Sequence, residues 1–534
     1  MPLEAHDPSK SSAHKRDSRF WLVFAANLLI DFLPALDLTA VSTALPTIVG
    51  HLNGTDFIWV GSAYTIASTA ILPLVGGLAA TLGRKPILLG FIIFFALGSA
   101  ISGAATSMNM LIAGRVVQGV GGGGLLSVTE IIYSDLVPLP ERGKFLGIIA
   151  SVWALACAIG PPIGGSLAQS GSWRWLFYLN IPICAVAFIL ALLFLNVQVP
   201  RQGFKNMLEQ MDWIGLTLVV SGTTAVSLAL AWGGDKLPWD SYQVLVPLCL
   251  GLVALVAFFI VEFKVAEHPT IPPFILKNVT TLSGLIGTAM HGLVSMAAIF
   301  YLPVYFQASK LSSPMESGTE LLAFALMIPF MAILAGVSIE YFNIYRPQNY
   351  IGWVFIVVGF GLLSMLEPGT SRVISTVYQA ILGIGFGILW IATQFPVMAP
   401  LPTSNNSHAL AFFTFVRVFA QNWGTVIGGA ILQNKLASRL PAEVLAAHPG
   451  AQIIYSLIPQ IGKLPSEIRL AVQQTYADGL RTIWYAMLGI SALGLLSCLI
   501  MQEVEMREAL DETWGLQEPS EVQNGRKIDA SNTV

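Results

Sequence analysis

Charged residues are scarce in this sequence of 534 residues: Asp, Glu, Lys and Arg make up 11% of it, against about 25% in an average soluble domain. A soluble chain of this length could not cover its surface with so few charges, so an ordinary cytosolic enzyme is excluded. Cysteine is scarce as well. The four cysteines lie far apart without CxxC spacing, which argues against a zinc site, a redox motif or a disulfide scaffold. They are Cys157, Cys184, Cys249 and Cys498.

Motifs of catalysis and of nucleic-acid binding are missing too. The sequence has no HExxH and no GxSxG motif. With a net charge of −3, it also has no broad basic surface for nucleic acid. Residues 119–124 match GxGxxG, but they lie inside an apolar helical segment and not between a strand and a helix, so a dinucleotide site is rejected. We therefore expect no enzyme activity, no cofactor and no metal.

Apolar residues are abundant: they make up 55% of the chain, and the mean hydropathy is +0.71. This composition indicates a polytopic helical membrane protein, in which each span takes about 20 apolar residues. Hydropathy with Gly, Pro and charge breaks predicts fourteen spans. They lie at residues 20–42, 58–80, 86–105, 110–133, 145–168, 175–195, 212–233, 243–263, 280–305, 320–340, 351–366, 374–399, 407–434 and 481–501.

Orientation follows from Lys and Arg, which concentrate on the cytoplasmic side of membrane proteins. They fall mostly in the segments that are inside if the N-terminus is cytoplasmic, and the even span count then puts the C-terminus there too. The sequon Asn53-Gly54-Thr55 would face outward as a glycosylation acceptor at Asn53.

An internal repeat appears when the chain is shifted by 264 residues, because six glycines then superpose. Residues 119, 121 and 123 match 383, 385 and 387, and residues 160, 164 and 165 match 424, 428 and 429. Both copies run in the same direction, which is typical of two six-span bundles related by an axis along the membrane normal. Generic small-residue packing is the alternative.

The repeat predicts the domain organisation of an all-α membrane protein. A cytoplasmic tail covers residues 1–19 and a first six-helix bundle residues 20–196. A linker with two inserted spans covers residues 197–279 and a second six-helix bundle residues 280–501. A second cytoplasmic tail covers residues 502–534.

The fifth span contains Gly160-Pro161-Pro162-Ile163-Gly164-Gly165. The prolines remove backbone donors and bend a helix, while the glycines admit a neighbour. We expect either a gate beside the transport pathway or a kink that only improves packing.

The tight turn between the second and third spans contains Gly83, Arg84 and Lys85. Inside-positive topology accounts for these charges by itself. The alternative is that they latch the inner face of the two bundles together.

Charges inside spans are the strongest functional signal, since each is costly unless it is paired or hydrated. Asp31 and Asp37 lie in the first span, Arg115 and Glu130 in the fourth, and Arg417 in the thirteenth. At 1.5 Å per residue, Asp37 and Arg115 lie at similar depths below the outer side, so they are predicted to meet. Asp31 and Arg417 lie near the midplane, and Glu130 lies near the inner end.

A buried carboxylate beside an arginine that changes partner can load and release a proton. We therefore name Asp37 with Arg115, and Asp31 as a second carboxylate, as proton-coupling candidates. A fixed structural ion pair is the alternative. His291 and His408 are lone histidines, and packing roles are predicted for both.

Several motifs together resemble the major facilitator superfamily, and most closely its fourteen-span drug:proton antiporter branch with fungal toxin-efflux members. The resemblance covers about residues 20–501. The matching runs are Leu36-Asp37-Leu38-Thr39 with Ala44-Leu45-Pro46, Gly76-Gly77-Leu78-Ala79 through Gly83-Arg84-Lys85, Arg115-Val116-Val117-Gln118-Gly119 with Gly121, Gly160-Pro161 with Gly164-Gly165, and Trp173-Arg174-Trp175 with Phe177, Asn180 and Pro182.

The resemblance implies a monomeric exporter in the lipid bilayer that exchanges protons for a small organic molecule by alternating access. It lends coupling roles to Asp37 and Arg115, and an antiport role to Gly160 and Pro161. The loop signature departs from the family at Ala80 and Thr81, which replace an Asp and a basic residue. Glu130 or Asp135 are candidate substitutes in the inner latch.

Three functions are therefore compared. The first is proton-driven export, expected at the plasma membrane. The second is vacuolar uptake of basic amino acids, which related fourteen-span proteins perform. The third is a non-transporting nutrient sensor, which favours a long folded tail; the predicted tail at 502–534 is short and polar.

Overall fold

The computed structural model describes residues 18–52, 58–195, 212–233, 237–266, 269, 274–402, 405–447 and 457–506. Over these residues the chain is helical, with one isolated bridge between Gly233 and Leu237. Within the described part, eleven helices are long and apolar enough to cross a membrane. The predicted sites that lie outside the described residues are the acceptor Asn53 and the segments 1–17, 196–211 and 507–534.

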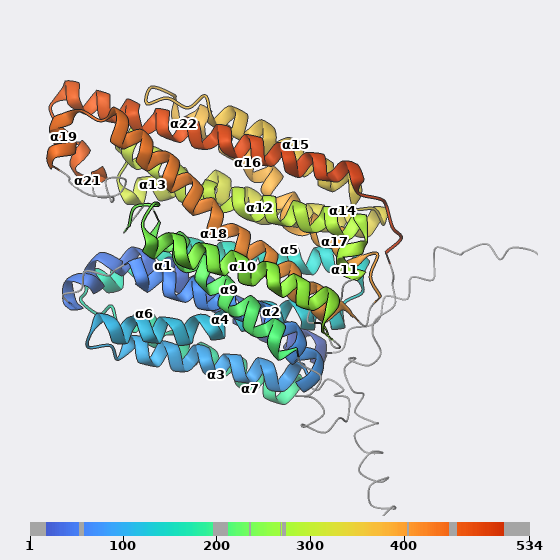
Figure 1. Cartoon of the computed structure of the whole chain (residues 1–534). Coiled ribbons are helices and arrows are strands. Elements are labelled where there is room, and N and C mark those ends of the chain that lie inside the picture. Colours follow the sequence, from blue (N-terminus) through green and yellow to red (C-terminus); the bar gives the residue numbers. More distant parts are fainter. Residues whose placement is uncertain are drawn as a thin grey trace, which may run out of the picture.

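The helices form two bundles and an inserted pair (Figure 1). The first bundle contains α1 (Ser18–Leu52), α2 (Ile58–Leu82), α3 (Arg84–Gly103), α4 (Met108–Leu136), η2 (Leu139–Glu141), α5 (Arg142–Gln169), α6 (Trp175–Tyr178) and α7 (Asn180–Phe194). The inserted pair is α9 (Trp213–Trp232) and α10 (Tyr242–Lys264). The second bundle contains α11 (Phe274–Lys277), α12 (Val279–Val304), η3 (Tyr305–Ser309), α13 (Pro314–Glu320), α14 (Leu322–Phe342), α15 (Arg346–Leu363), α16 (Arg372–Ala392), α17 (Gln394–Met398), α18 (Asn406–Arg439), α19 (Ala442–Ala447), α21 (Ile458–Ile461), α22 (Ser466–Ser497) and η5 (Cys498–Ile500).

The fourteen predicted spans each have a corresponding long helix or helix pair in the described chain. Three further long helices, α5, α15 and α18, are not among the eleven, yet they run beside them (Figure 1). The boundaries differ most at two helices. α1 continues to Leu52 instead of ending near residue 42, and α22 begins at Ser466 instead of near residue 481.

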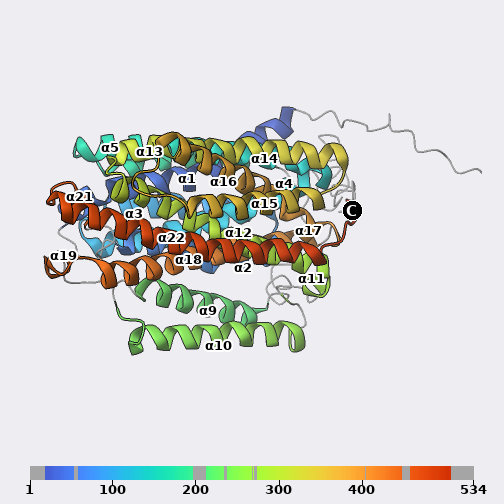
Figure 2. The ribbon, with the colours of Figure 1, turned by 90° about the horizontal axis from the view of Figure 1, so that it is seen from above.

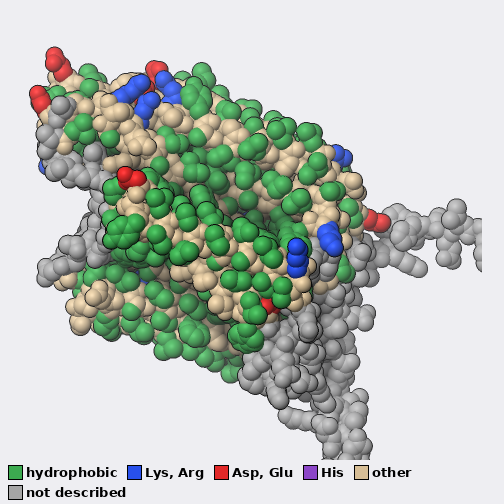
Figure 3. Space-filling model, in the orientation of Figure 1, with side chains coloured by type: hydrophobic (Ala, Val, Ile, Leu, Met, Phe, Trp, Pro, Cys, Tyr) green, Lys and Arg blue, Asp and Glu red, His purple; other side chains and the backbone are tan. Residues whose placement is uncertain are grey.

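The inserted pair lies outside the two bundles, as Figure 2 shows from above. α9 packs against α2 of the first bundle and α18 of the second, whereas α10 packs mainly on α9. α10 therefore exposes a row of large apolar side chains, among them Leu250, Val253 and Val256. Apolar side chains also cover the face shown in Figure 3, with charges gathered near its ends. Such a surface matches lipid and not water.

The repeated glycines make matching contacts in the two bundles. In the first bundle, α4 approaches α2 and α3 through its glycines, and in the second, α16 approaches α14 and α15 in the same way. Likewise α5 approaches α1, and α18 approaches α12. A Cβ atom added at these glycines would collide with the facing helix; they are Gly119, Gly121, Gly123, Gly160 and Gly164, with Gly383, Gly385, Gly387, Gly424 and Gly428. The spacing seen in the sequence is thus a requirement of close helix contact.

One end of the molecule holds the start of α1, the turn from α2 to α3 and the start of α5. Arg19 donates to the carbonyl oxygen of Phe194 there, which joins α1 to the end of α7. Gly83 makes the tight turn with φ of 89°, a backbone region that side chains other than glycine rarely adopt. We name this end the inner end, after the cytoplasmic side predicted from Lys and Arg.

Candidate functional site

A buried polar network surrounds Asp37 of α1 in the middle of the first bundle. Arg115 of α4 forms a salt bridge with one carboxylate oxygen of Asp37. The other oxygen accepts from Gln118 Nε2 at 2.8 Å and from Asn180 Nδ2 at 3.2 Å. The Ser99 hydroxyl accepts from the same two amides, at 2.9 and 3.3 Å. Four helices, α1, α3, α4 and α7, therefore meet at one carboxylate.

Arg115 is fixed by further contacts of its guanidinium. Its Nε donates to the Val60 carbonyl oxygen at 2.9 Å, and Nη1 also donates to Gln118 Oε1 at 2.8 Å. The guanidinium carbon lies 4.5 Å from the centre of the Tyr64 ring, a cation–π distance. Asp37 and Arg115 expose only 2% and 1% of their surface. The predicted meeting of the two residues is therefore present in the structure, and their role in proton coupling stays a prediction.

Asp31 lies elsewhere on α1 and has a different kind of neighbourhood. Its two oxygens accept from the hydroxyls of Thr129 at 2.8 Å and Tyr133 at 3.2 Å, both on α4. These partners carry no charge at neutral pH. Asp31 is 3% exposed. It is thus a buried carboxylate held by hydroxyls and stands apart from the Asp37 network.

The inner end joins the two bundles through Arg84. Its Nε donates to Asp135 at 2.7 Å within the first bundle, and its Nη2 donates to the Ser407 hydroxyl of α18 at 2.7 Å. The loop signature around the turn from α2 to α3 has Ala80 at the position where the family has Asp. Arg84 of that signature pairs instead with Asp135, which lies on α4. Lys85 points elsewhere, since its ammonium donates to the Leu192 carbonyl at the end of α7. Consecutive helical residues project about 100° apart, so Arg84 and Lys85 cannot share one face.

The second seam between the bundles lies between α5 and α14. Gly143 and Gly336 face each other so closely that a Cβ atom on either would collide with the backbone of the other. Lys144 Nζ lies 2.8 Å from Glu340 Oε1 across the same seam. On the opposite seam, a Cβ atom on Gly76 of α2 would meet Ala411 of α18 at 2.8 Å. The inner end is therefore closed on both sides.

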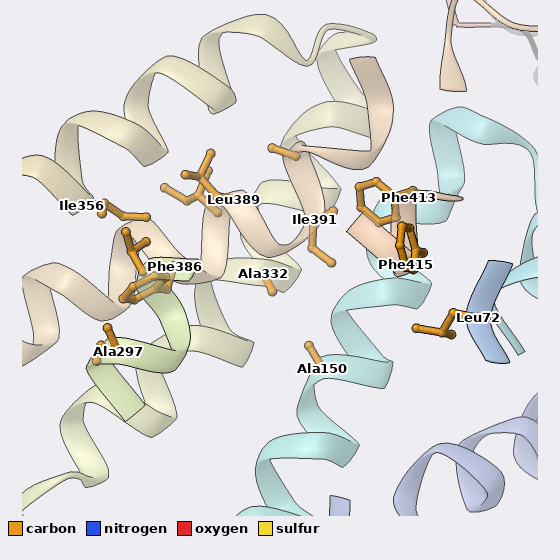
Figure 4. Packing of buried hydrophobic residues seen from close by; sticks show 14 of the residues in the cluster. Leu72, Ala150, Ala297, Ala332, Ile356, Phe386, Leu389, Ile391, Phe413 and Phe415 are labelled. Carbon is orange, nitrogen blue, oxygen red and sulfur yellow. The ribbon is translucent and has the colours of Figure 1, made fainter. Parts of the chain in front are cut away.

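Apolar residues from both bundles continue this closure into the interior. Figure 4 shows Leu72 of α2 and Ala150 of α5 in one region with Phe413 and Phe415 of α18. All four belong to one cluster of buried residues. The bundles therefore share an apolar core in their inner halves.

α5 runs as one helix through the predicted antiporter motif, so the motif does not interrupt it. Gly160 and Gly164 allow α5 to approach Thr39 and Ala40 of α1, and Gly165 is half-buried beside them. The Pro161 side chain lies outside the described residues. A gating role for the motif stays a prediction.

A second polar group lies where α4 of the first bundle meets α18. The Thr414 hydroxyl of α18 donates to Glu130 of α4. One turn further along α18, Arg417 donates to the Trp390 carbonyl oxygen at 3.0 Å. Its guanidinium carbon lies 4.9 Å from the Trp390 ring centre and 4.4 Å from that of Phe413. Glu130 and Arg417 thus bring opposite charges from the two bundles to this seam.

Sequence reasoning placed the charges but missed their uncharged partners. Gln118, Ser99 and Asn180 complete the Asp37 network. Two hydroxyls of the second bundle form hydrogen bonds with charged side chains of the first: Ser407 with Arg84, and Thr414 with Glu130. Gln118 lies three residues after Arg115, a spacing that puts both on one helix face and offered a signal. Ser407 and Thr414 gave none, because a hydroxyl in an apolar helix can bond to its own backbone.

The comparisons with known proteins agree with this arrangement. A family model described as Major Facilitator Superfamily matches residues 28–425. Efflux pump FUS6 of Gibberella moniliformis (strain M3125 / FGSC 7600) is 36% identical over 538 residues, covering 97% of this chain and 95% of that protein. MFS efflux transporter aclA of Aspergillus oryzae (strain ATCC 42149 / RIB 40) is 35% identical and covers 96% of this chain and 95% of that protein.

Among solved structures, the proton:xylose symporter XylE bound to 6-bromo-6-deoxy-D-glucose shares the fold. Its TM-score is 0.56 with 12% sequence identity, covering 92% of this chain and 98% of that one. The two-bundle helical architecture predicted from the sequence is thereby confirmed, and so is the family that the motifs resemble. The chain therefore belongs to the Major Facilitator Superfamily, as a multi-pass membrane transporter and not an enzyme.

Proposed function

We propose that the chain exports a small organic molecule and that proton influx drives this export. The relatives named as efflux pumps support export, and the buried Asp37–Arg115 pair supports proton coupling. That pair is the observation that carries the proposal. A carboxylate this deep in a membrane protein is costly, so a purely structural network would be better served by neutral groups.

Protonation of Asp37 would remove the charge that Arg115 pairs with. The proton would come from the outer side, bind one carboxylate oxygen, and leave toward the inner side after the bundles change state. Gln118 and Asn180 also donate to Asp37, so a neutral Asp37 would leave their amides with a weaker acceptor. The whole polar network would then rearrange.

α4 connects this network to the closed inner end. Glu130 lies fifteen residues after Arg115 on the same helix, about 22 Å away at 1.5 Å per residue. Glu130 contacts Thr414, and Asp135 near the end of α4 holds the arginine that contacts Ser407. A shift of α4 on protonation would therefore reach both contacts, with Gly83 and Arg84 acting as the inner latch.

We place the transporter in the plasma membrane as a monomer, with a secondary metabolite or toxin as its substrate. The relatives support this class of substrate, because their names describe fungal efflux pumps. We also propose that Asn53 faces outward as a glycosylation acceptor. Fluorescence of a tagged chain tests the location and would place a basic amino acid carrier in the vacuole instead.

Substitution Asp37→Asn tests the coupling. We expect pH-driven efflux to fall at least tenfold, because an amide of similar shape accepts hydrogen bonds but binds no proton at physiological pH. The substrate is first identified as the metabolite retained inside a deletion strain of the native host. Efflux of that metabolite is then measured in proteoliposomes with and without a pH gradient.

Glu316→Gln is the matched control, since Glu316 caps the start of α13 away from the network. It should transport like the unmodified chain. Undiminished proton-driven efflux by the Asp37→Asn protein would reject the coupling role. A deletion strain that retains no metabolite, together with no flux of a broad substrate panel through the unmodified chain in proteoliposomes, would reject export and favour a sensor.

A further inference from the structure

Arg417 is a buried cation that has no carboxylate in contact among the residues the structure describes. It is 7% exposed. Within the described part of the chain it forms no salt bridge, and its Nε has no hydrogen-bond partner. Its Nη2 donates to backbone and hydroxyl oxygens of Trp390 and Thr393. Arg115, the buried arginine of the first bundle, has by contrast a carboxylate in contact.

His291 of α12 is a second incompletely bonded group beside Arg417. It is fully buried, and among the described residues neither ring nitrogen makes a hydrogen bond of good geometry, although the Phe386 backbone lies nearby. Its ring lies 5.4 Å from Phe386 and 6.1 Å from Trp390, measured between ring centres. A neutral imidazole always carries one donor and one acceptor, and burying both unbonded is unfavourable. Two unsatisfied groups share the Trp390 ring as neighbour.

Glu130 supplies a negative charge near Arg417, and it comes from the other bundle. It is held by Thr414, three residues before Arg417 on the same face of α18. In the described residues Glu130 forms no salt bridge with Arg417, so the two opposite charges lie near each other without direct contact. An opening of the inner end that moved α4 away from α18 would take this charge from Arg417 and give it access to water.

On the basis of the proposed export function, we propose that Arg417, His291 and the rings of Trp390 and Phe413 bind an anionic group of the exported molecule, and that Glu130 displaces it when the inner end closes. Guanidinium groups bind carboxylates with paired hydrogen bonds, and flanking rings stack on a planar body. The substrate class is therefore a planar, conjugated organic acid. Capture occurs from the inner side and release follows closure.

Competition between Glu130 and the substrate explains why the two charges do not form a closer pair. A tight Glu130–Arg417 salt bridge would hold the inner end shut. A missing Glu130 would leave the acid bound after closure. In the structure Glu130 is held by Thr414 and not by Arg417, an arrangement that would let an acid compete for the guanidinium.

The test measures binding of three probes with one aromatic body to the purified full chain in detergent micelles at pH 7. The probes are 2-naphthoate, 2-naphthalenemethanol and 2-naphthylmethylamine, which are anionic, neutral and cationic. We expect the acid to bind at least tenfold more tightly than the alcohol and the amine. Arg417→Gln should remove this preference, and Arg417→Lys should keep part of it. Equal binding of acid and alcohol by the unmodified chain, or no binding of the acid, would overturn the proposal.

Arg372→Gln serves as the matched control, because Arg372 is an exposed arginine at the start of α16. It loses the same charge and should bind the acid normally. Loss of acid binding in both variants would mean that net charge, and not the site, decides binding, which also overturns the proposal.

Glu130→Gln tests the displacement step. We expect it to bind 2-naphthoate at least threefold more tightly, and this gain should vanish when Arg417→Gln is added. A gain that persists in the double variant, or no gain at all, would reject the competition. Binding is measured without a proton gradient. If proton-driven transport fails but the chain still binds 2-naphthoate more tightly than the alcohol, only the proposed coupling is rejected. If transport is normal but the chain shows no preference for the acid, only this inference is rejected.

Discussion

At the residue scale, Arg84 is one of the side chains that connect the two bundles. Three of its nitrogens donate, to Asp135, to the Ala79 carbonyl and to Ser407, and only the last acceptor belongs to the second bundle. When the bundles part, the first two bonds persist and the third breaks. The hydrogen bond between Arg84 and Ser407 is therefore the part of the latch that we expect to break and re-form during transport.

Ser407→Ala should weaken inner closure without harming the fold of either bundle. A hydrogen bond to a charged group contributes about 1.5–3 kcal/mol, so the population of the inner-open state should rise roughly tenfold or more. Reactivity of a cysteine placed at Ala411, which the closed seam covers, reports this population. Ser364→Ala is the control, since its hydroxyl bonds within α15. Equal reactivity of the cysteine in the Ser407→Ala and Ser364→Ala proteins would show that Ser407 does not stabilise the closed inner end.

At this scale the sequence predicted the charged residues of the site far better than their partners. Asp37 and Arg115 were located by depth alone, because an ionised group in a membrane must find an opposite charge. Asp135 was named only as one of two substitutes, and the latch role of Lys85, whose ammonium donates to the Leu192 carbonyl oxygen, stays a prediction. The direction of a side chain depends on helix rotation, which the spacing of apolar residues leaves open when a helix is apolar all round.

At the scale of elements, α5 and α14 approach closely because each has a glycine at the crossing. Gly336→Leu should keep the inner end open, since its side chain would run into the backbone of Gly143. We expect export to fall at least tenfold while the protein still inserts in the membrane. Retained efflux together with an unreactive inner seam would contradict this.

The control is Gly90→Leu, because a Cβ atom at Gly90 meets nothing within 4 Å. It makes the same change in a spanning helix of the first bundle. Its efflux and its cysteine reactivity should match those of the unmodified chain.

The elements themselves were predictable, because long apolar runs in membranes have almost only one solution, the helix. Their ends were not. α22 begins well before its apolar stretch, where Gln473 donates to the Ser309 carbonyl oxygen of η3. Such a polar start is stabilised by tertiary contacts, so hydropathy does not detect it.

At the scale of the whole molecule, the closed inner end predicts that the bundles must separate during transport. Lys144→Cys with Glu340→Cys, in a chain whose native cysteines are replaced, should be joined by a short bifunctional thiol reagent, since the native side chains are in contact. Cross-linking should abolish efflux, and each single variant should keep it. Efflux measured before and after the reagent checks this, and normal efflux by the joined protein would exclude a rocking mechanism.

The inserted helices give the molecule one protected flank. α9 spans the seam between α2 and α18, and α10 lies outside it, whereas the seam between α5 and α14 has no comparable cover in the described chain. An apolar compound dissolved in the bilayer would thus meet α9 and α10 at the seam between α2 and α18, whereas at the seam between α5 and α14 it would meet the two bundles directly. We therefore expect lateral access from the lipid, for a molecule that takes that route, to favour the flank between α5 and α14.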